Sequence, residues 1–94
     1  MVPVHPGSIL REELETRSLS ANALSRALRV NSGRIVEILN GKRAISADTA
    51  LRLARYFDMT PQFWMNLQAA YDLDLATRAT ADRIKRDVHP REAA

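Results

Sequence analysis

Few side chains in this sequence have the type and spacing that catalysis or metal binding requires. The 94 residues include no cysteine, and the two histidines, His5 and His89, stand near opposite ends of the chain. Asp72 and Asp74 are two residues apart, and on a helix such residues do not face each other. No glycine-rich phosphate loop and no metal-ligand spacing occurs. The sequence therefore predicts no catalytic residue, no metal site and no cofactor, and it does not indicate an enzyme.

Basic residues are concentrated in the middle third of the chain. The segment from Arg17 to Arg43 contains six basic residues and one acidic residue, a net charge of +5 in a chain whose overall charge is +3. Such a segment favours a polyanion as partner. A solvated helical face explains a short run of charge equally well, so charge alone does not decide the function.

Composition and length indicate one small folded domain. Hydrophobic residues make up 46% of the chain and charged residues 27%, as in ordinary globular domains. No apolar run approaches the roughly 18 residues of a membrane span, and the N-terminus lacks the pattern of a signal peptide. Because an absence of cysteine suits a reducing compartment, we expect a cytoplasmic protein without a membrane partner.

The spacing of apolar residues predicts an all-α fold of five helices. Apolar residues recur every three or four positions, and no segment alternates as a strand would. Caps and helix breakers bracket the five segments. They span about residues 8–16, 20–29, 31–40, 46–57 and 60–75. We expect residues 1–75 to form the domain and residues 76–94 a C-terminal extension that is partly helical or disordered.

The second and third predicted helices have the spacing of a helix-turn-helix. Two helices of about eight residues joined by three or four residues cross steeply. Counted from Ala21, the fourth, eighth, tenth, fifteenth and eighteenth residues must be apolar and the fifth small, and every position fits. These residues are Leu24, Leu28, Val30, Ile35, Ile38 and the small Ser25. The ninth residue, where the turn favours glycine, is Arg29, which predicts a strain of order 1 kcal/mol.

Three segments resemble a known family. Residues 31–43, Asn-Ser-Gly-Arg-Ile-Val-Glu-Ile-Leu-Asn-Gly-Lys-Arg, are similar to the recognition helix and following loop of Xre/Cro-type helix-turn-helix proteins. The opening His5-Pro-Gly with Ile9-Leu-Arg-Glu-Glu, and residues 45–73 with their Pro-Gln-Phe-Trp-Met-Asn-Leu-Gln run, are similar to HigA antitoxins. The resemblance covers about residues 4–75.

The resemblance implies both a fold and a function. The fold is a five-helix, lambda-repressor-like helix-turn-helix domain with a short C-terminal extension. The function is that of an antitoxin that forms a homodimer, binds double-stranded operator DNA at its own promoter, and neutralises a HigB-like toxin that cleaves messenger RNA. Two further functions stay open: a stand-alone repressor with no toxin, and a protein-interaction domain that does not bind DNA.

Helix-turn-helix docking places the start of the second helix of the pair in the major groove. Arg34 is the strongest candidate to pair with guanine, with a phosphate contact as the alternative, and Gly33 allows close approach to DNA. Glu37 is expected to pair with a nearby arginine rather than to read a base. The expected DNA contacts are Ser20, Asn22, Asn31, Ser32, Gly33, Arg34, Lys42 and Arg43.

An aromatic stripe in the fifth helix suggests both core and dimer contacts. Phe63 and Leu67 are expected in the core, while Trp64 or Tyr71 is available to a second copy, since aromatic residues are enriched at interfaces. The dimer candidates are therefore Trp64, Leu67 and Tyr71.

The first helix is the candidate toxin-binding surface. The C-terminal segment is mostly basic and cannot mask the basic active site of a ribonuclease by charge. We therefore expect the toxin to dock on Glu12, Glu13 and Glu15. The alternative is that these glutamates only solubilise the helix.

Overall fold

The structure is a computed structural model that describes residues 3–92, and within that range it contains five helices and no strand. Residues 1–2 and 93–94, which the expected domain boundaries include, lie outside the described range. The helices are α1 (Pro6–Thr16), α2 (Ala21–Leu28), α3 (Ser32–Leu39), α4 (Ala47–Phe57) and α5 (Pro61–Asp87). The expected all-α fold of five helices is confirmed.

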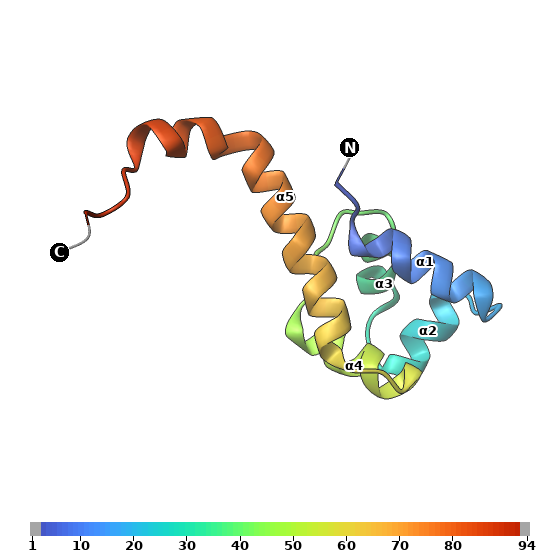
Figure 1. Cartoon of the computed structure of the whole chain (residues 1–94). Helices are drawn as coiled ribbons and strands as arrows, with labels where there is room; N and C mark the ends of the chain where they lie inside the picture. Colours follow the sequence, from blue (N-terminus) through green and yellow to red (C-terminus); the bar gives the residue numbers. More distant parts are fainter. Residues whose placement is uncertain (1–2, 93–94) are drawn as a thin grey trace.

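The core forms where α1 to α4 meet the first half of α5 (Figure 1). α2 packs against α3 and α4, α1 packs against α3 and α5, and α4 packs against α5. Ser25, 3% exposed, lets α2 and α3 approach closely, and its hydroxyl donates to the Asn22 carbonyl at 2.8 Å. The apolar helix-turn-helix residues all lie in or against this core: Leu24, Leu28, Val30, Ile35 and Ile38.

The turn between α2 and α3 contains one residue in the left-handed conformation, Arg29. Arg29 follows the last residue of α2 with φ 60° and ψ 44°, the left-handed region. A side chain with a Cβ is strained there. The strain expected from an arginine at the glycine position of this turn is therefore present.

α1 begins two residues earlier than its sequence suggests. The imidazole of His5 caps the helix, because Nδ1 accepts a hydrogen bond from the Gly7 amide at 2.8 Å. Gly7 is also where α1 lies against α3. A Cβ on Gly7 would stand 1.9 Å from the Ile38 carbonyl oxygen, so this contact requires glycine.

The aromatic residue that α5 buries in the core differs from the one predicted. Trp64 is 0% exposed, whereas Phe63 is 39% exposed. The prediction that Trp64 is available to a second copy is therefore wrong, and so is the placement of Phe63 in the core. The line of buried residues on the inner side of α5 passes through Trp64 and Gln68, one residue out of phase with the prediction.

Gln68 fixes the segment that leads into α4. Its side chain is buried, and its Oε1 accepts a hydrogen bond from the Ile45 amide at 2.8 Å. Its Nε2 donates to Asp72 at 2.8 Å. The buried side chain of Gln68 thus supplies a hydrogen-bond acceptor for the backbone amide of Ile45, which lies between α3 and α4 and has no partner within a helix.

α5 continues as one helix to Asp87, although its apolar pattern ends near Leu75. Its 27 residues span about 40 Å, and its second half projects away from the domain (Figure 1). The radius of gyration is 16.7 Å, against about 13 Å for a compact chain of this size. The pattern ends because these turns face solvent, while helix-forming residues and an ion pair between Arg78 and Asp74 continue the helix.

Within residues 3–92, no helix combines the length and the apolar character that crossing a lipid bilayer demands.

Candidate nucleic-acid interface

The two helix starts that are expected to meet DNA are both capped by predicted DNA-contact residues. The Ser20 hydroxyl accepts a hydrogen bond from the Ala23 amide at 3.1 Å. The Asn31 side chain accepts one from the Gly33 amide at 2.7 Å. Each cap satisfies one amide of the first turn, and the other amides at a helix start can donate to an anion such as phosphate.

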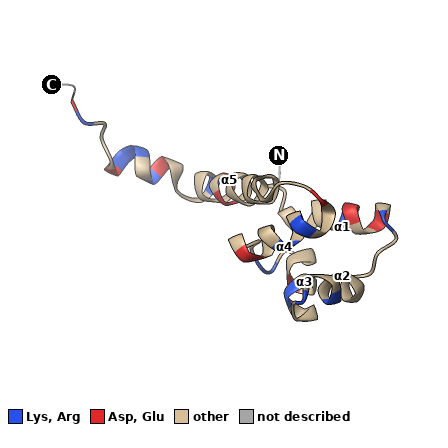
Figure 2. Cartoon of the chain, turned by 90° about the horizontal axis from the view of Figure 1, so that it is seen from below, with Lys and Arg blue, Asp and Glu red and all other residues tan. Residues whose placement is uncertain are grey.

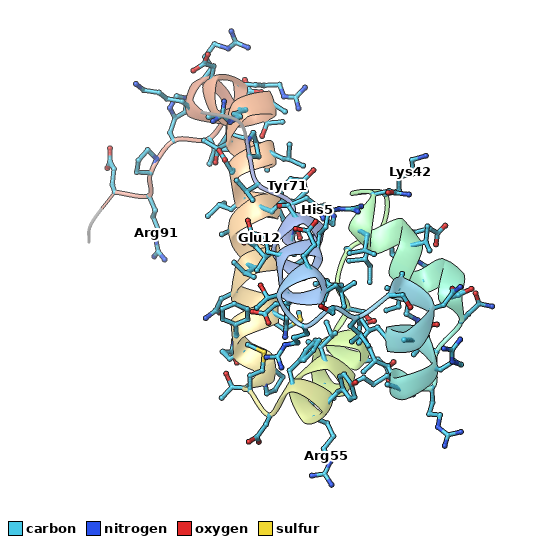
Figure 3. The ribbon with its side chains drawn as sticks, turned by 90° about the vertical axis from the view of Figure 1, so that its right-hand side faces the viewer. His5, Glu12, Lys42, Arg55, Tyr71 and Arg91 are labelled. Atoms are coloured by element: carbon cyan, nitrogen blue, oxygen red, sulfur yellow. The ribbon has the colours of Figure 1, made fainter. Side chains whose placement is uncertain are left out.

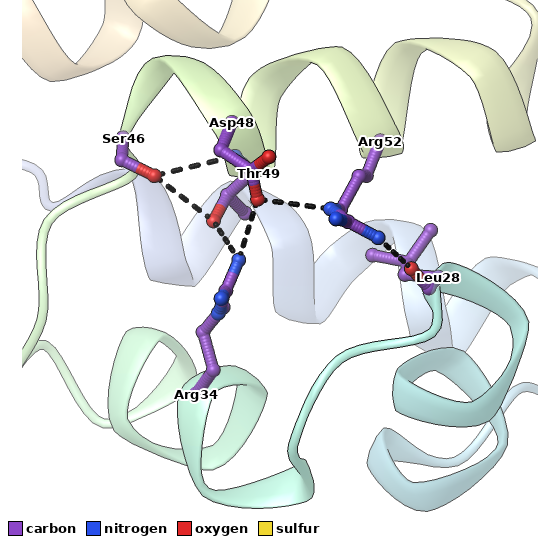
Figure 4. A network of polar contacts seen from close by, with 6 residues as sticks. All are labelled: Leu28, Arg34, Ser46, Asp48, Thr49 and Arg52. Atoms are coloured by element: carbon purple, nitrogen blue, oxygen red, sulfur yellow. Dashed lines mark hydrogen bonds and ion pairs between the residues drawn. The ribbon is translucent and has the colours of Figure 1, made fainter.

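Arg34 is held by the start of α4 (Figure 4). Its Nη1 donates to Asp48 Oδ2 at 2.8 Å and to the Thr49 hydroxyl at 3.4 Å. Asp48 also accepts from Arg52 Nε at 2.9 Å, and Arg52 Nη1 donates to the Leu28 carbonyl at 2.8 Å. This network connects α3 and α4 to the end of α2, so the side chain predicted to read guanine already has a partner within the fold.

The network also sets the acidity of Asp48. Hydrogen bonds from the guanidinium groups of Arg34 and Arg52, in that order, hold the pKa of the Asp48 carboxyl below its ordinary value of 3.8. Asp48 was not among the residues predicted for the site. Its position in the first turn of α4, where a carboxylate suits the helix dipole, was the available signal.

The outer face of α3 carries exposed and half-buried residues. Ile35 and Ile38 point into the core, and the residues on the opposite side include Gly33, Val36 and Asn40. Val36 is 42% exposed. Sequence analysis did not single out Val36 or Asn40, although their positions three and seven residues after Gly33 place all three on one side of the helix.

The cations of the loop after α3 differ in their contacts. Arg43 Nε donates to Glu37 Oε1 at 2.7 Å, which confirms the expectation that Glu37 pairs with an arginine. Lys42 extends into solvent (Figure 3). Arg11 reaches across from α1 and donates to the Leu39 carbonyl at 3.2 Å, so a cation also stands at the C-terminus of α3.

The predicted toxin-binding glutamates lie on α1, on which Figure 2 shows acidic segments beside basic ones. Glu12 and Glu15 are exposed, whereas Glu13 pairs with Arg17 at 3.1 Å. Glu15 and Ser20 line the same shallow hollow. The acidic face of α1 therefore adjoins the start of α2.

The predicted dimer residues do not form an exposed patch. Leu67 is half-buried against the core, and Tyr71 packs edge to face on His5 with ring centroids 4.8 Å apart (Figure 3). Besides Phe63, α5 exposes apolar residues further along the helix, and two of them, Leu73 and Ile84, lie on one side. This side is lined by Leu73, Ala76, Thr77, Thr80, Ala81, Ile84 and Lys85.

The geometry agrees with what comparison to known proteins finds. Residues 10–64 match the helix-turn-helix family. Virulence-associated protein I of Dichelobacter nodosus is 56% identical over 77 residues, which cover 81% of this chain and 71% of that protein.

Solved structures are similar over nearly the whole chain. An addiction module antidote protein of the HigA family from Coxiella burnetii is 49% identical, with a TM-score of 0.93 over 97% of this chain and 100% of that one. The antitoxin HigA of Pseudomonas aeruginosa, solved with the higBA promoter, is 46% identical, with a TM-score of 0.92 over 96% of this chain and 99% of that one.

Proposed function

We propose, from the premise that this chain belongs to the HigA antitoxins of the Xre-type helix-turn-helix family, that it is a dimeric antitoxin that represses its own operon and neutralises a HigB-like toxin. The observation that carries the DNA-binding part is the exposed outer face of α3, flanked by a capped helix start on one side and by Lys42 on the other. A relative, the antitoxin HigA of Pseudomonas aeruginosa, was solved with the higBA promoter, which supports DNA binding by this chain.

In this proposal α3 enters the major groove and the surrounding groups contact phosphates. The start of α2, with Ser20 and Asn22, lies against one strand. Lys42, and Arg43 through its unpaired donors, contact the backbone at the other end of α3. Arg34 can contact DNA only if a base or phosphate displaces Asp48 from its guanidinium group. We therefore assign Arg34 mainly the role of positioning α3 against α4.

Operator binding tests the DNA part. Lys42→Ala is expected to weaken binding to all DNA sequences and to lower the slope of log affinity against log salt by about one. Arg55→Ala is the matched control, because Arg55 is exposed at the opposite end of the molecule (Figure 3). Equal effects of the two substitutions would contradict the proposed surface.

A dimer follows from the geometry of DNA. One module of this size contacts few base pairs, and a two-fold dimer reads two half-sites about 34–36 Å apart or a multiple of that distance. We place the dimer contact on the exposed side of α5 between Leu73 and Ile84, because Trp64 and Leu67 lie in or against the core and Tyr71 packs on His5. The operator is then an inverted repeat, and a footprint over a single asymmetric half-site would contradict the dimer.

The toxin part rests on the family and on the acidic face of α1. Co-purification of the chain with the product of its neighbouring gene tests it, and a small basic ribonuclease is the expected partner. Reversal of Glu12 and Glu15 to lysine is expected to abolish neutralisation, whereas truncation after Asp87, which leaves α5 intact, is not. Loss of neutralisation only in the truncated chain would place the toxin on the segment after Asp87 instead of on α1. If no protein co-purifies, the chain would be a stand-alone repressor.

A further inference from the structure

Val36 is an exposed apolar side chain in the middle of the proposed reading helix. The two isoleucines of α3 are completely buried, whereas Val36 is 42% exposed. It lies three residues after Gly33 and four residues before Asn40, so the three residues form a strip along the outer face. In this strip Val36 supplies the apolar side chain.

The charged side chains of α3 are already engaged on either side of this strip. Arg34 pairs with Asp48 at 2.8 Å, and Glu37 pairs with Arg43. Each ion pair joins one charge of α3 to an opposite charge from the following loop or helix. The outer face of α3 is therefore close to neutral, and contacts between this face and a base edge do not depend on charge.

Gly33 carries no side chain beside Val36. Its φ is not in the left-handed region, and a Cβ there would have a single neighbour within 4 Å, the Asn31 side-chain oxygen at 3.1 Å, which is closer than an ordinary van der Waals contact. Glycine at this position therefore leaves the backbone of α3 uncovered by a side chain. A base edge can come closer to the helix axis here than at a turn that carries a side chain, and this approach brings it within reach of the Val36 methyl groups.

The major-groove edge of thymine carries one apolar group, the 5-methyl, and apolar side chains recognise it by contact. We propose that Val36 is a specificity-determining residue that reads thymine 5-methyl groups in the operator half-site. This inference rests on the proposed DNA-binding function. It makes thymine contact by Val36, rather than guanine pairing by Arg34, the main source of sequence preference on α3.

Substitution of uracil for thymine tests the inference, because it removes only the methyl group. Each thymine of the operator is replaced in turn, symmetrically in both half-sites, and Kd is measured by fluorescence anisotropy. For the natural chain, at least one replacement is expected to raise Kd about three- to fivefold for each methyl lost. For Val36→Ala, Kd for the natural operator rises, and the same replacement has no further effect, so the two changes are not additive.

Two controls make the result decisive. Leu51→Ala removes an exposed apolar side chain from α4 and is expected to keep the full uracil effect. Val36→Ile, which keeps methyl groups at this position, is expected to retain it as well. Insensitivity of the natural chain to every uracil, or an undiminished uracil effect in Val36→Ala, would overturn the inference while operator binding itself stands. Absence of operator binding by the natural chain would overturn the proposed function and this inference with it.

Discussion

At the scale of single residues, Asp48 makes the start of α4 sensitive to acid. Its pKa is lowered in the folded chain by Arg34 and Arg52, so the ionised carboxylate stabilises the fold. A group with a lowered pKa contributes its full stabilisation above the pKa of the unfolded chain and loses it as the pH falls through the folded value. The contribution is therefore complete near neutral pH and disappears below about pH 4.

Comparison with Asp48→Asn checks this expectation. The urea midpoint of the natural chain is expected to exceed that of the variant at pH 7, and the difference is expected to shrink as the pH falls below about 4. Asp74→Asn is a suitable control, because it removes an exposed ion pair on α5 that connects no two helices. A difference between natural chain and Asp48→Asn that stays constant from pH 7 to pH 3 would contradict the role of the carboxylate.

Arg29 stores strain in the turn of the helix-turn-helix. Because glycine adopts a φ of 60° without a Cβ clash, Arg29→Gly is expected to raise the free energy of unfolding by about 1 kcal/mol. Arg26→Gly, in the last turn of α2, is expected to lower it by about the same amount, because glycine weakens a helix. Chemical denaturation measures both, and equal destabilisation by the two glycines would show that the turn is unstrained.

At the scale of elements, the packing of α1 on α3 depends on Gly7. The position 1.9 Å from the Ile38 carbonyl oxygen cannot accommodate a methyl group unless a backbone moves. Gly7→Ala is therefore expected to destabilise the fold by about 2–3 kcal/mol. Gly33→Ala, where a Cβ would meet only the end of the Asn31 side chain at 3.1 Å, is expected to change stability by no more than about 1 kcal/mol. Thermal unfolding of the two alanine variants compares these outcomes, and equal stability would contradict the close approach of α1 and α3.

Gln68 couples α5 to the segment before α4. Gln68→Leu keeps the volume in the core but leaves the Ile45 amide without its acceptor, and an unsatisfied buried amide costs about 1–3 kcal/mol. Gln62→Leu on the same helix serves as control, because Gln62 bonds only to the exposed Asn66. The free energy of unfolding is expected to fall in the first variant alone. A similar loss in both would indicate that Gln68 has no special role.

At the scale of the whole molecule, the projecting half of α5 is the proposed dimer contact. Leu73 is 70% exposed and Ile84 52% exposed on one side of a helix that extends beyond the domain. Aspartate at both positions is expected to leave the helical circular dichroism unchanged, to convert a dimer into a monomer in analytical ultracentrifugation, and to weaken operator binding. Leu51→Asp on α4 controls for loss of exposed apolar surface. A variant that stays dimeric would move the interface to another face.

The sequence by itself determined the five helices and the helix-turn-helix. Caps, breakers and apolar spacing act between residues a few positions apart, so the chain encodes them locally. Ser20 and Asn31 cap the helices that their positions predict, and the strain at Arg29 follows from the length of the turn. Even the pairing of Glu37 with an arginine spans only six residues.

Only the tertiary structure decided which side of each element meets a partner. The rotation of α5 that buries Trp64 and exposes Phe63 depends on how α4 and α1 pack against it. The Arg34–Asp48 pair joins residues fourteen positions apart, and it exists because α3 and α4 meet at their starts. A shift of one residue rotates a helical face by about 100°, and no local signal fixes that rotation. Packing fixes it instead, because this rotation fills the core with Trp64 and brings Gln68 to the Ile45 amide.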